Sequence, residues 1–517
     1  MMLLVAGMAM TVMAVPAKRG GVTRVDADGT EKQVFLYGDE SFHYMTDAEG
    51  NWLDEETLLP LSEELKNEKL VLKNDENKRM KVRRAPQETG VDHLLSPRGA
   101  VILVSYSDLD FESTKEDMED WAMGENYTYN GATGSIHQYF LDQSWGEYDL
   151  QLDIFGPVKV SKKMAYYGAN DSQGNDKHPD ELVKEACILA HDSCGADFSQ
   201  YDFDNDGYVD WVVIIYAGYG ESSGAGANTI WPHQYELSYT YSTFKLDGKK
   251  VDRYCCLNEK EYTTKARDGI GTFCHEFSHV MGLPDLYSTN SDMTLHTLSS
   301  WDIMDAGSYN NTGNTPPNYS AYERWFMGWT TPRILTDPEN VKLKPLQDSK
   351  ECLLMCDSDV HNLDGVNPQP RTFYLLETRV KEGWDAYLPG RGMLITKIQY
   401  SPSRWKTNQV NNSESQMGVD IMEAKANTSY RAKSTDAFPA GADAFTKFEG
   451  HEITNIKRNT TNGNITFKYR GGTEGVESIL YSEDSVQKIL LDGQILIIRN
   501  NKLYDLNGRL VHENNQL

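Results

Sequence analysis

The stretch TFCHEFSHVMGLPDLY, from Thr272 to Tyr287, largely decides the fold expected for this sequence. His275 and His279 are four residues apart, so on a helix both imidazoles project from one face and can bind one Zn²⁺. Glu276 lies beside them, where its carboxylate can polarise a bound water. Gly282 is placed to end the helix and turn the chain. The stretch therefore predicts a metal-binding helix followed by a tight turn.

The turn leads the chain back towards the metal, which makes Asp285 the expected third zinc ligand. Three protein ligands leave one position for water, as in a catalytic rather than a structural zinc site. An alternative stays open, in which Asp285 buttresses the turn while Asp302 or Asp305 binds the metal. Tyr309 is a candidate donor to a developing oxyanion, and the alternative for Tyr309 is a packed aromatic side chain.

An acidic loop upstream predicts a second ion site. Carboxylates occupy loop positions 1, 3, 5 and 9, with glycine at position 6 and a backbone carbonyl at position 7, as in calcium loops. Val213 stands where such loops carry a glutamate, so further ligands must come from elsewhere or from water. An acidic turn without an ion is the alternative. The expected ligands of a structural Ca²⁺ are Asp202, Asp204, Asp206, Tyr208 and Asp210.

Hydrophobic patterning around these motifs predicts a mixed domain with helices against a sheet. Strands are expected at residues 100–106, 151–160 and 208–216, and helices at 114–123, 135–143 and 180–194. Beyond about residue 340 the pattern changes to strands and turns, for example at 372–378, 392–400 and 464–469. Residues 471–475 (GGTEG) predict a flexible hinge before a small β module.

The N-terminal region predicts export and processing. An apolar run from Leu3 to Val15 is typical of a signal peptide and is too short to span a bilayer. No later segment is apolar enough to suggest a transmembrane span. A basic cluster at residues 78–84 indicates a proteolytic cut that releases a pro-segment, and an ordinary linker is the alternative. The pro-segment has no cysteine, so a carboxylate or steric blockage is expected to keep a precursor latent.

The composition excludes some partners. The 517 residues include 77 Asp plus Glu against 50 Lys plus Arg, for a formal net charge of −27. Nucleic acid is therefore not an expected partner, because phosphate binding depends mostly on cationic side chains. Seven cysteines in so long a chain do not form a disulfide scaffold.

These motifs, in this order, resemble the M6 peptidases typified by immune inhibitor A. The resemblance spans roughly residues 98–470 and rests on HEFSHVMGLPDLY and WDIMDAGSY, with GSIHQYFLDQSWGEYDL, DFDNDGYVDWVVIIYAGYGE and DAFPAG around them. It implies an α+β fold with a zincin/metzincin-like catalytic domain, in which a mixed sheet accompanies the active-site helix and Met304 lies beneath the zinc. It also implies a secreted zinc endopeptidase that is made as a zymogen.

The expected domains are a signal peptide (1–17), a pro-segment (18–97), the catalytic domain (98–345), a mostly β continuation (346–470) and a C-terminal β module (476–517). The last region resembles the sorting modules of type IX secretion, which implies contact with secretion machinery and a secreted or cell-surface protein. The alternative is a small β domain that only stabilises the fold.

The expected function is hydrolysis of peptide bonds in protein or peptide substrates by a Zn-activated water, with Glu276 as the general base. Two other hypotheses stay open: a calcium-stabilised surface adhesion module on a peptidase scaffold, and a zinc hydrolase of non-peptide amides or esters. The intact motif weighs against adhesion, because a binding module does not need a base beside two metal ligands.

Overall fold

The computed structural model describes residues 13–26, 28–73, 97–172, 174–290, 295–473, 487–491, 494–499, 502–506 and 509–513. The chain divides into two compact units, Met1–Gly471 and Gly472–Leu517. The basic cluster at residues 78–84 and most of the expected signal peptide lie outside the described residues. Within the described part of the chain, none of the helices combines the length and the apolar character that crossing a membrane requires.

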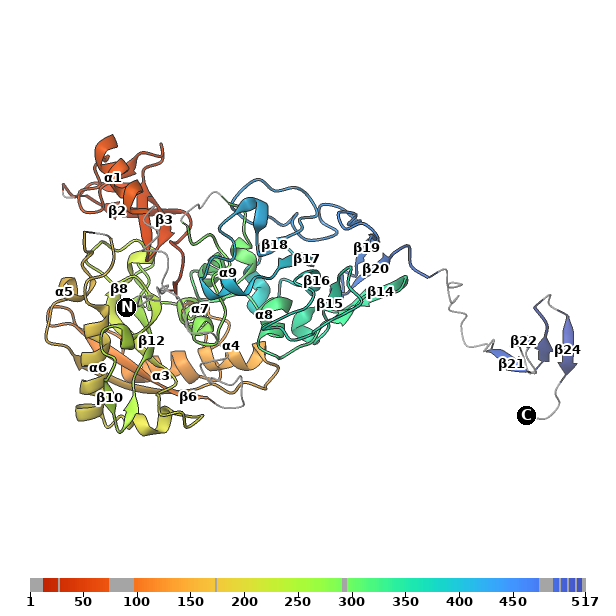
Figure 1. Ribbon diagram of the computed structural model, residues 1–517, viewed down its shortest axis with the longest axis horizontal. Coiled ribbons are helices and arrows are strands. Elements are labelled where there is room, and N and C mark those ends of the chain that lie inside the picture. Colours follow the sequence, from red (N-terminus) through yellow and green to blue (C-terminus); the bar gives the residue numbers. More distant parts are fainter. Residues whose placement is uncertain are drawn as a thin grey trace, which may run out of the picture. The chain divides into compact units, whose positions relative to one another are not determined.

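The first unit is built around a six-stranded mixed sheet (Figure 1). Its strand order is β1 (Met13–Ala14), β9 (His233–Glu236), β12 (Arg253–Lys260), β8 (Val212–Tyr219), β6 (Arg98–Ser105) and β7 (Gln151–Lys159). The last four of these strands are parallel, whereas β9 runs antiparallel to β12 and β1 antiparallel to β9. The apolar runs of β6 and β8 are buried along nearly their whole length, as parallel strands covered on both faces should be.

Helices α3 (Lys115–Met123), α6 (Pro179–Cys194) and α7 (Gly271–Val280) contact strands of this sheet. Helix α4 (Ile136–Gln143) packs against α3, and α5 (Met164–Gly168) packs against α6. The expected helices are present, and Thr114 and Ser135 cap α3 and α4 through their hydroxyls. Strand β8 begins later than expected, because residues 202–210 form the acidic loop.

Helix α7 carries the metal motif and is buried on every side. The ring of Phe277 contacts Trp211 and Phe140 at centroid distances of 4.7 and 5.3 Å. At the start of the helix, a Cβ on Gly271 would lie 1.9 Å from the carbonyl oxygen of Ser308. Glycine is therefore required where the 306–309 turn approaches the helix, and this contact fixes the turn against α7.

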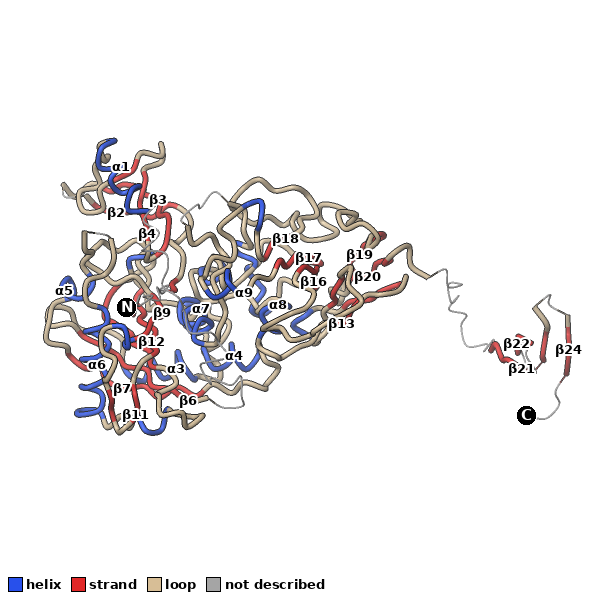
Figure 2. The backbone as a smooth tube through the Cα atoms, in the orientation of Figure 1, coloured by secondary structure: helices blue, strands red, loops and turns tan. Residues whose placement is uncertain are grey.

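The later part of the first unit is rich in strands (Figure 2). A five-stranded sheet has the order β13 (Arg333–Ile334), β15 (Leu353–Met355), β16 (Thr372–Arg379), β17 (Gly392–Gln399) and β18 (Val419–Ile421). A three-stranded sheet has the order β14 (Glu339–Leu343), β20 (Ile465–Tyr469) and β19 (Ile453–Arg458). The short helices α8 (Ala321–Phe326) and α9 (Pro402–Lys406) accompany these sheets. The mixed fold expected from the sequence is thus present.

The described residues of the expected pro-segment, 18–26 and 28–73, are folded. They form a four-stranded antiparallel sheet from β2 (Gly21–Val25), β3 (Glu31–Asp39), β4 (Phe42–Thr46) and β5 (Trp52–Leu53), with helix α1 (Glu63–Lys73) after it. Gly38 has a φ of +102°, and a Cβ there would lie 2.0 Å from the carbonyl oxygen of Phe42. This glycine permits the tight end of the β3–β4 hairpin.

The second unit is a four-stranded antiparallel sheet of β21 (Gln487–Leu491), β22 (Gln494–Arg499), β23 (Lys502–Tyr504) and β24 (Leu510–Glu513). The break between the units, after Gly471, falls at the start of the glycine-rich stretch in which the sequence predicts a hinge.

Candidate metal centre

Three ligand atoms meet where α7 ends and the following loop turns back. Nε2 of His275 lies 3.2 Å from Nε2 of His279 and 3.1 Å from Oδ1 of Asp285. Nε2 of His279 is 3.2 Å from the same oxygen. Ligand atoms bound to one tetrahedral Zn²⁺ at about 2.0 Å stand roughly 3.3 Å apart. The three atoms therefore match one face of a zinc coordination tetrahedron.

The hydrogen-bond partners of the imidazoles fix their tautomers. Nδ1 of His275 lies 2.7 Å from the carbonyl oxygen of Ile303, and Nδ1 of His279 lies 2.8 Å from that of Leu283. A carbonyl oxygen only accepts, so in neutral imidazoles Nδ1 carries the hydrogen and Nε2 presents a lone pair. Two lone pairs and a carboxylate oxygen then face one another, an arrangement that a cation stabilises.

Asn408, from the segment after α9, holds the third ligand. Its Oδ1 accepts a hydrogen bond from the backbone N–H of Asp285 at 2.7 Å, and its amide group donates to Oδ2 of Asp285. Only Oδ1 of Asp285 is then directed at the two imidazoles. The sequence contains no signal for this contact, because the two residues are 123 positions apart.

Glu276 is wholly buried beside the ligands. Its Oε1 accepts a hydrogen bond from the backbone N–H of Val15 at 2.6 Å. Burial, followed by the charge of Asp285, raises the pKa of Glu276 well above its usual range. A carboxyl group with a raised pKa can take up a proton near neutral pH and release it again. A residue that acts first as a general base and then as a general acid needs this property.

The β3–β4 hairpin of the expected pro-segment carries two further carboxyl groups whose pKa values respond to the charge of Asp285. Burial and the charge of Asp285 raise the pKa of Asp39 to about 6. Burial and the charges of Asp39, Asp285 and Glu276 raise the pKa of Glu40. Oε2 of Glu40 is buried and has no hydrogen-bond partner among the described residues. So many buried carboxyl groups fit a divalent cation, because unpaired buried charge is costly.

The other candidate ligands face elsewhere. Oδ1 of Asp302 accepts from the backbone N–H of Met304, whereas Asp305 accepts from the guanidinium of Arg19 and from backbone N–H groups. Met304 is fully buried, and its carbonyl oxygen accepts from Leu286, next to the third ligand. The hydroxyl of Tyr309 donates to the carbonyl oxygen of Pro16 at 2.7 Å. The cluster at the metal motif contains Asp285 and neither Asp302 nor Asp305.

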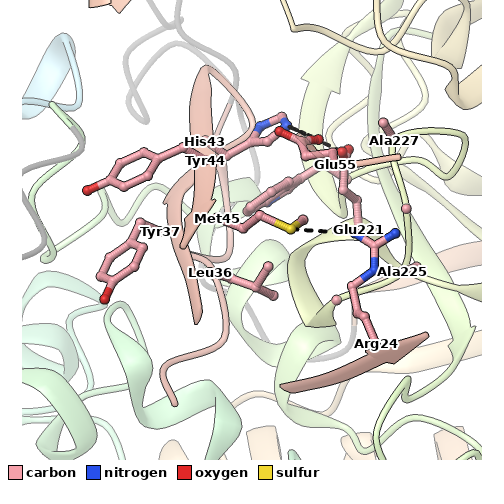
Figure 3. Close-up of a pocket in the computed structure, with 13 residues that line it drawn as sticks. Arg24, Leu36, Tyr37, His43, Tyr44, Met45, Glu55, Glu221, Ala225 and Ala227 are labelled. Atoms are coloured by element: carbon pink, nitrogen blue, oxygen red, sulfur yellow. Dashed lines mark hydrogen bonds and ion pairs between the residues drawn. The ribbon is translucent and has the colours of Figure 1, made fainter. Parts of the chain in front are cut away.

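A second charged cluster joins the expected pro-segment to the segment after β8 (Figure 3). Nε2 of His43 lies 3.3 Å from Oε1 of Glu221 and 3.6 Å from Oε2 of Glu55. The imidazole also stacks on Trp231, with centroids 4.9 Å apart. Although burial opposes its charge, the two carboxylates hold the pKa of His43 well above its usual range. This cluster anchors the β3–β4 hairpin to Glu221 and Trp231.

The acidic loop brings together three of its expected ligands. Carboxylate oxygens of Asp202, Asp204 and Asp210 lie within 4.8 Å of one another. Asp206 is outside this group, and its Oδ1 accepts from the backbone N–H of Tyr208. Burial and the neighbouring charges of Asp204 and Asp202 raise the pKa of Asp210 to about 7. Lys249 forms an ion pair with Asp202 and supplies part of the positive charge that the loop needs.

Residues 104–331 match the family described as immune inhibitor A peptidase M6, catalytic domain. Immune inhibitor A of Bacillus thuringiensis subsp. alesti is 31% identical over 223 residues, which cover 37% of this chain and 31% of that protein. The pre-pro-metalloprotease PrtV of Vibrio cholerae serotype O1 (strain M66-2) is 30% identical over 227 residues, covering 38% of this chain and 24% of PrtV. The chain thus spans a third or less of the length of these relatives. The matched region contains His275, Glu276, His279 and Asp285, and the match supports a protease.

Proposed function

We propose that this protein is a secreted zinc endopeptidase that is made as a latent precursor. The observation that carries the proposal is the triangle of His275 Nε2, His279 Nε2 and Asp285 Oδ1, with edges of 3.1–3.2 Å and with Glu276 beside it. The match to an M6 catalytic domain and the metalloprotease name of one relative support it. The apolar N-terminal run supports export.

The three ligands would hold Zn²⁺, and the bound ion would polarise the attacked carbonyl and lower the pKa of water. Glu276 then takes the proton of the attacking water and passes it to the leaving amine. The buried surroundings of Glu276 raise its pKa and so suit it to holding that proton between the two steps. The carbonyl oxygens of Ile303 and Leu283 keep both imidazoles in the tautomer that binds metal.

Latency in this proposal comes from the pro-segment. Glu40 has a buried carboxylate oxygen without a described partner, and the charges of Asp285 and Glu276 help to raise its pKa. A carboxylate is a competent zinc ligand, so Glu40 would take the position that water needs.

The remaining expectations belong to the same proposal. A Ca²⁺ ion bound by Asp202, Asp204 and Asp210 would rigidify the loop that leads into β8, and the buried, unpartnered Oδ1 of Asp202 is available to it within the described structure. The C-terminal sheet would serve the secretion machinery. Thermal unfolding with and without added Ca²⁺ tests the first idea, because a bound ion raises the midpoint.

Casein digestion tests the activity. The secreted, processed protein and its Glu276→Ala variant are loaded with equal zinc and compared, with Glu116→Gln on the exposed first turn of α3 as the control. We expect the wild type and the control to cut casein, and the Glu276→Ala variant to retain zinc while losing activity by several orders of magnitude.

Other outcomes favour the other hypotheses. If zinc-loaded wild type cuts neither casein nor a panel of unfolded proteins but hydrolyses small esters or amides, it is a non-peptide hydrolase. If it hydrolyses nothing and binds surface ligands, the adhesion hypothesis replaces the peptidase.

A further inference from the structure

Residues 13–19 occupy the metal centre in the manner of a bound peptide. Strand β1 joins the edge of the six-stranded sheet antiparallel to β9, with Met13 opposite Gln234 and Ala14 opposite His233. Residues 13–17 are buried, and β1 contacts both β9 and α7. Adding an extended peptide to an exposed sheet edge is a general mode of peptide recognition, because the backbone hydrogen bonds form regardless of the peptide's side chains.

The peptide bond between Ala14 and Val15 is held at both ends by groups of the metal centre. The hydroxyl of Tyr287 donates to the carbonyl oxygen of Ala14 at 2.7 Å. The backbone N–H of Val15 donates to Oε1 of Glu276 at 2.6 Å. In peptide hydrolysis the carbonyl oxygen gains negative charge and the nitrogen receives a proton. A donor therefore lies at the atom that becomes negative, and the proposed proton carrier lies at the atom that is protonated.

Beyond this bond the chain is held by further backbone contacts. Nε1 of Trp231 donates to the carbonyl oxygen of Val15 at 2.9 Å, and the hydroxyl of Tyr309 donates to that of Pro16. The backbone N–H of Lys18 donates to the carbonyl oxygen of Ser222 at 2.9 Å. These contacts fix the register of a bound chain without reading its side chains.

The next two side chains of this segment are cationic, and each forms an ion pair with a carboxylate. Nζ of Lys18 lies 2.5 Å from Oε1 of Glu261, whose side chain is 5% exposed. The guanidinium of Arg19 lies 2.8 Å from Oδ1 of Asp305, whose side chain is fully buried. A buried carboxylate that loses its cation is left with a large desolvation penalty. Glu261 and Asp305 will therefore favour a new cation once residues 13–19 have left.

We propose that peptide substrates follow the path of residues 13–19, with Tyr287 as the catalytic donor to the carbonyl oxygen of the cleaved bond. Glu261 and Asp305 select Lys or Arg at the fourth and fifth positions on the C-terminal side of that bond. This inference rests on the proposed peptidase function and adds its substrate class to it. Tyr309 contacts the chain two residues further on, so it positions the substrate rather than stabilising the oxyanion.

The first experiment uses the processed enzyme and a synthetic peptide with the sequence of residues 10–21. We expect mass spectrometry to find cleavage between Ala14 and Val15. A second peptide carrying Lys18→Gln and Arg19→Gln should have a kcat/KM at least roughly tenfold lower, because it leaves two buried carboxylates unpaired. An enzyme with Glu261→Gln and Asp305→Asn should cleave both peptides at similar rates.

The second experiment compares two tyrosine variants that differ only in where the lost hydroxyl lies. Tyr287→Phe should lower kcat by about a hundredfold with little change in KM, as loss of one oxyanion donor does. Tyr309→Phe should act mainly on KM. Equal cleavage of the two peptides by the wild type overturns the inference. A loss of kcat in Tyr309→Phe with none in Tyr287→Phe overturns it as well. In either case, cleavage of casein by the wild type leaves the proposed function standing. A wild type that cuts no peptide and no casein overturns both.

Discussion

Asn408 shows how much of the metal centre depends on a side chain that is not a ligand. Its amide holds Asp285 through both the backbone N–H and Oδ2, which leaves one carboxylate oxygen for the metal. The two imidazoles are fixed in the same way by backbone carbonyls. Such outer contacts raise affinity because the ligands do not have to be ordered when the metal binds.

Asn408→Ala should therefore weaken zinc binding by about 10- to 100-fold without removing a ligand. Competition with a chromogenic chelator measures this loss. Asn412→Ala is the matched control, because the Asn412 amide binds Thr289 in the adjoining loop and not Asp285. Unchanged zinc affinity in Asn408→Ala, in a protein that still unfolds cooperatively, would contradict the role given to Asn408.

In the proposed function, latency depends on the β3–β4 hairpin. Its turn carries Asp39 and Glu40, whose pKa values respond to the charge of Asp285. His43, just after the turn, pairs with Glu55 of the expected pro-segment and with Glu221 after β8. Lys69 also pairs with Glu55, and Asp176 adds a further buried carboxyl group near Glu221. The position of the hairpin therefore depends on a buried charge cluster that responds to pH.

The direction of this response follows from the pKa shifts. The pKa of His43 is raised in the folded protein, so its ion pairs contribute fully below its unfolded value of about 6.5 and are lost as pH rises through the folded value. Although burial opposes it, His43 and Lys69 lower the pKa of Glu55 to about 2. The ion pairs of Glu55 therefore stabilise the folded protein above its unfolded pKa of about 4.5, and this stabilisation is lost as the pH falls towards 2. Burial raises the pKa of Glu221, and His43 partly offsets this rise. A raised carboxyl pKa favours the folded protein at low pH, which is opposite to the effect of Glu55. Together these shifts favour a docked pro-segment at mildly acidic pH.

His43→Gln should accelerate removal of the pro-segment by an added protease, and more so at pH 5–6 than at pH 9. The ratio of digestion rates of variant and wild type at each pH measures this, because it cancels the pH dependence of the protease. His137→Gln, which loses a surface ion pair with Asp149, is the control and should give a ratio near one. A ratio for His43→Gln that is independent of pH would count against the charge cluster.

The whole molecule consists of a first unit that holds the metal centre and a second unit built as its own sheet. Every contact described at the metal centre lies within the first unit. The strands of the second unit pair only with one another among the described residues. In the proposed function, catalysis and any sorting role are therefore assigned to different parts of the chain.

A protein that ends at Gly471 should cut casein at the wild-type rate and unfold at the same temperature as the first unit of the full chain. Calorimetry and the casein assay check this. A sorting role for the second unit predicts in addition that the shortened protein stays inside the producing cell. A shortened protein with lower activity or a lower unfolding temperature would show that the second unit stabilises the first.

Local sequence patterns predicted most of the elements around the metal centre. The periodicity at 180–194 and the apolar run at 100–106 correspond to α6 and β6, with boundaries shifted by one or two residues. The signal is strong because these segments bury one face or both faces in the same core. The folded pro-segment was not predicted, because its short strands are partly exposed and have weak alternation.

The sequence by itself determined the metal motif, because the spacing of His275, Glu276 and His279 on one helix is a local property. It also placed Asp285 among the candidates, but a choice between Asp285, Asp302 and Asp305 required the turns that separate them. Only the tertiary structure brought Asn408 to Asp285, and Tyr287 and Glu276 to the two ends of one peptide bond. These contacts join segments up to hundreds of residues apart, and their partners are chosen by packing, which no local pattern records.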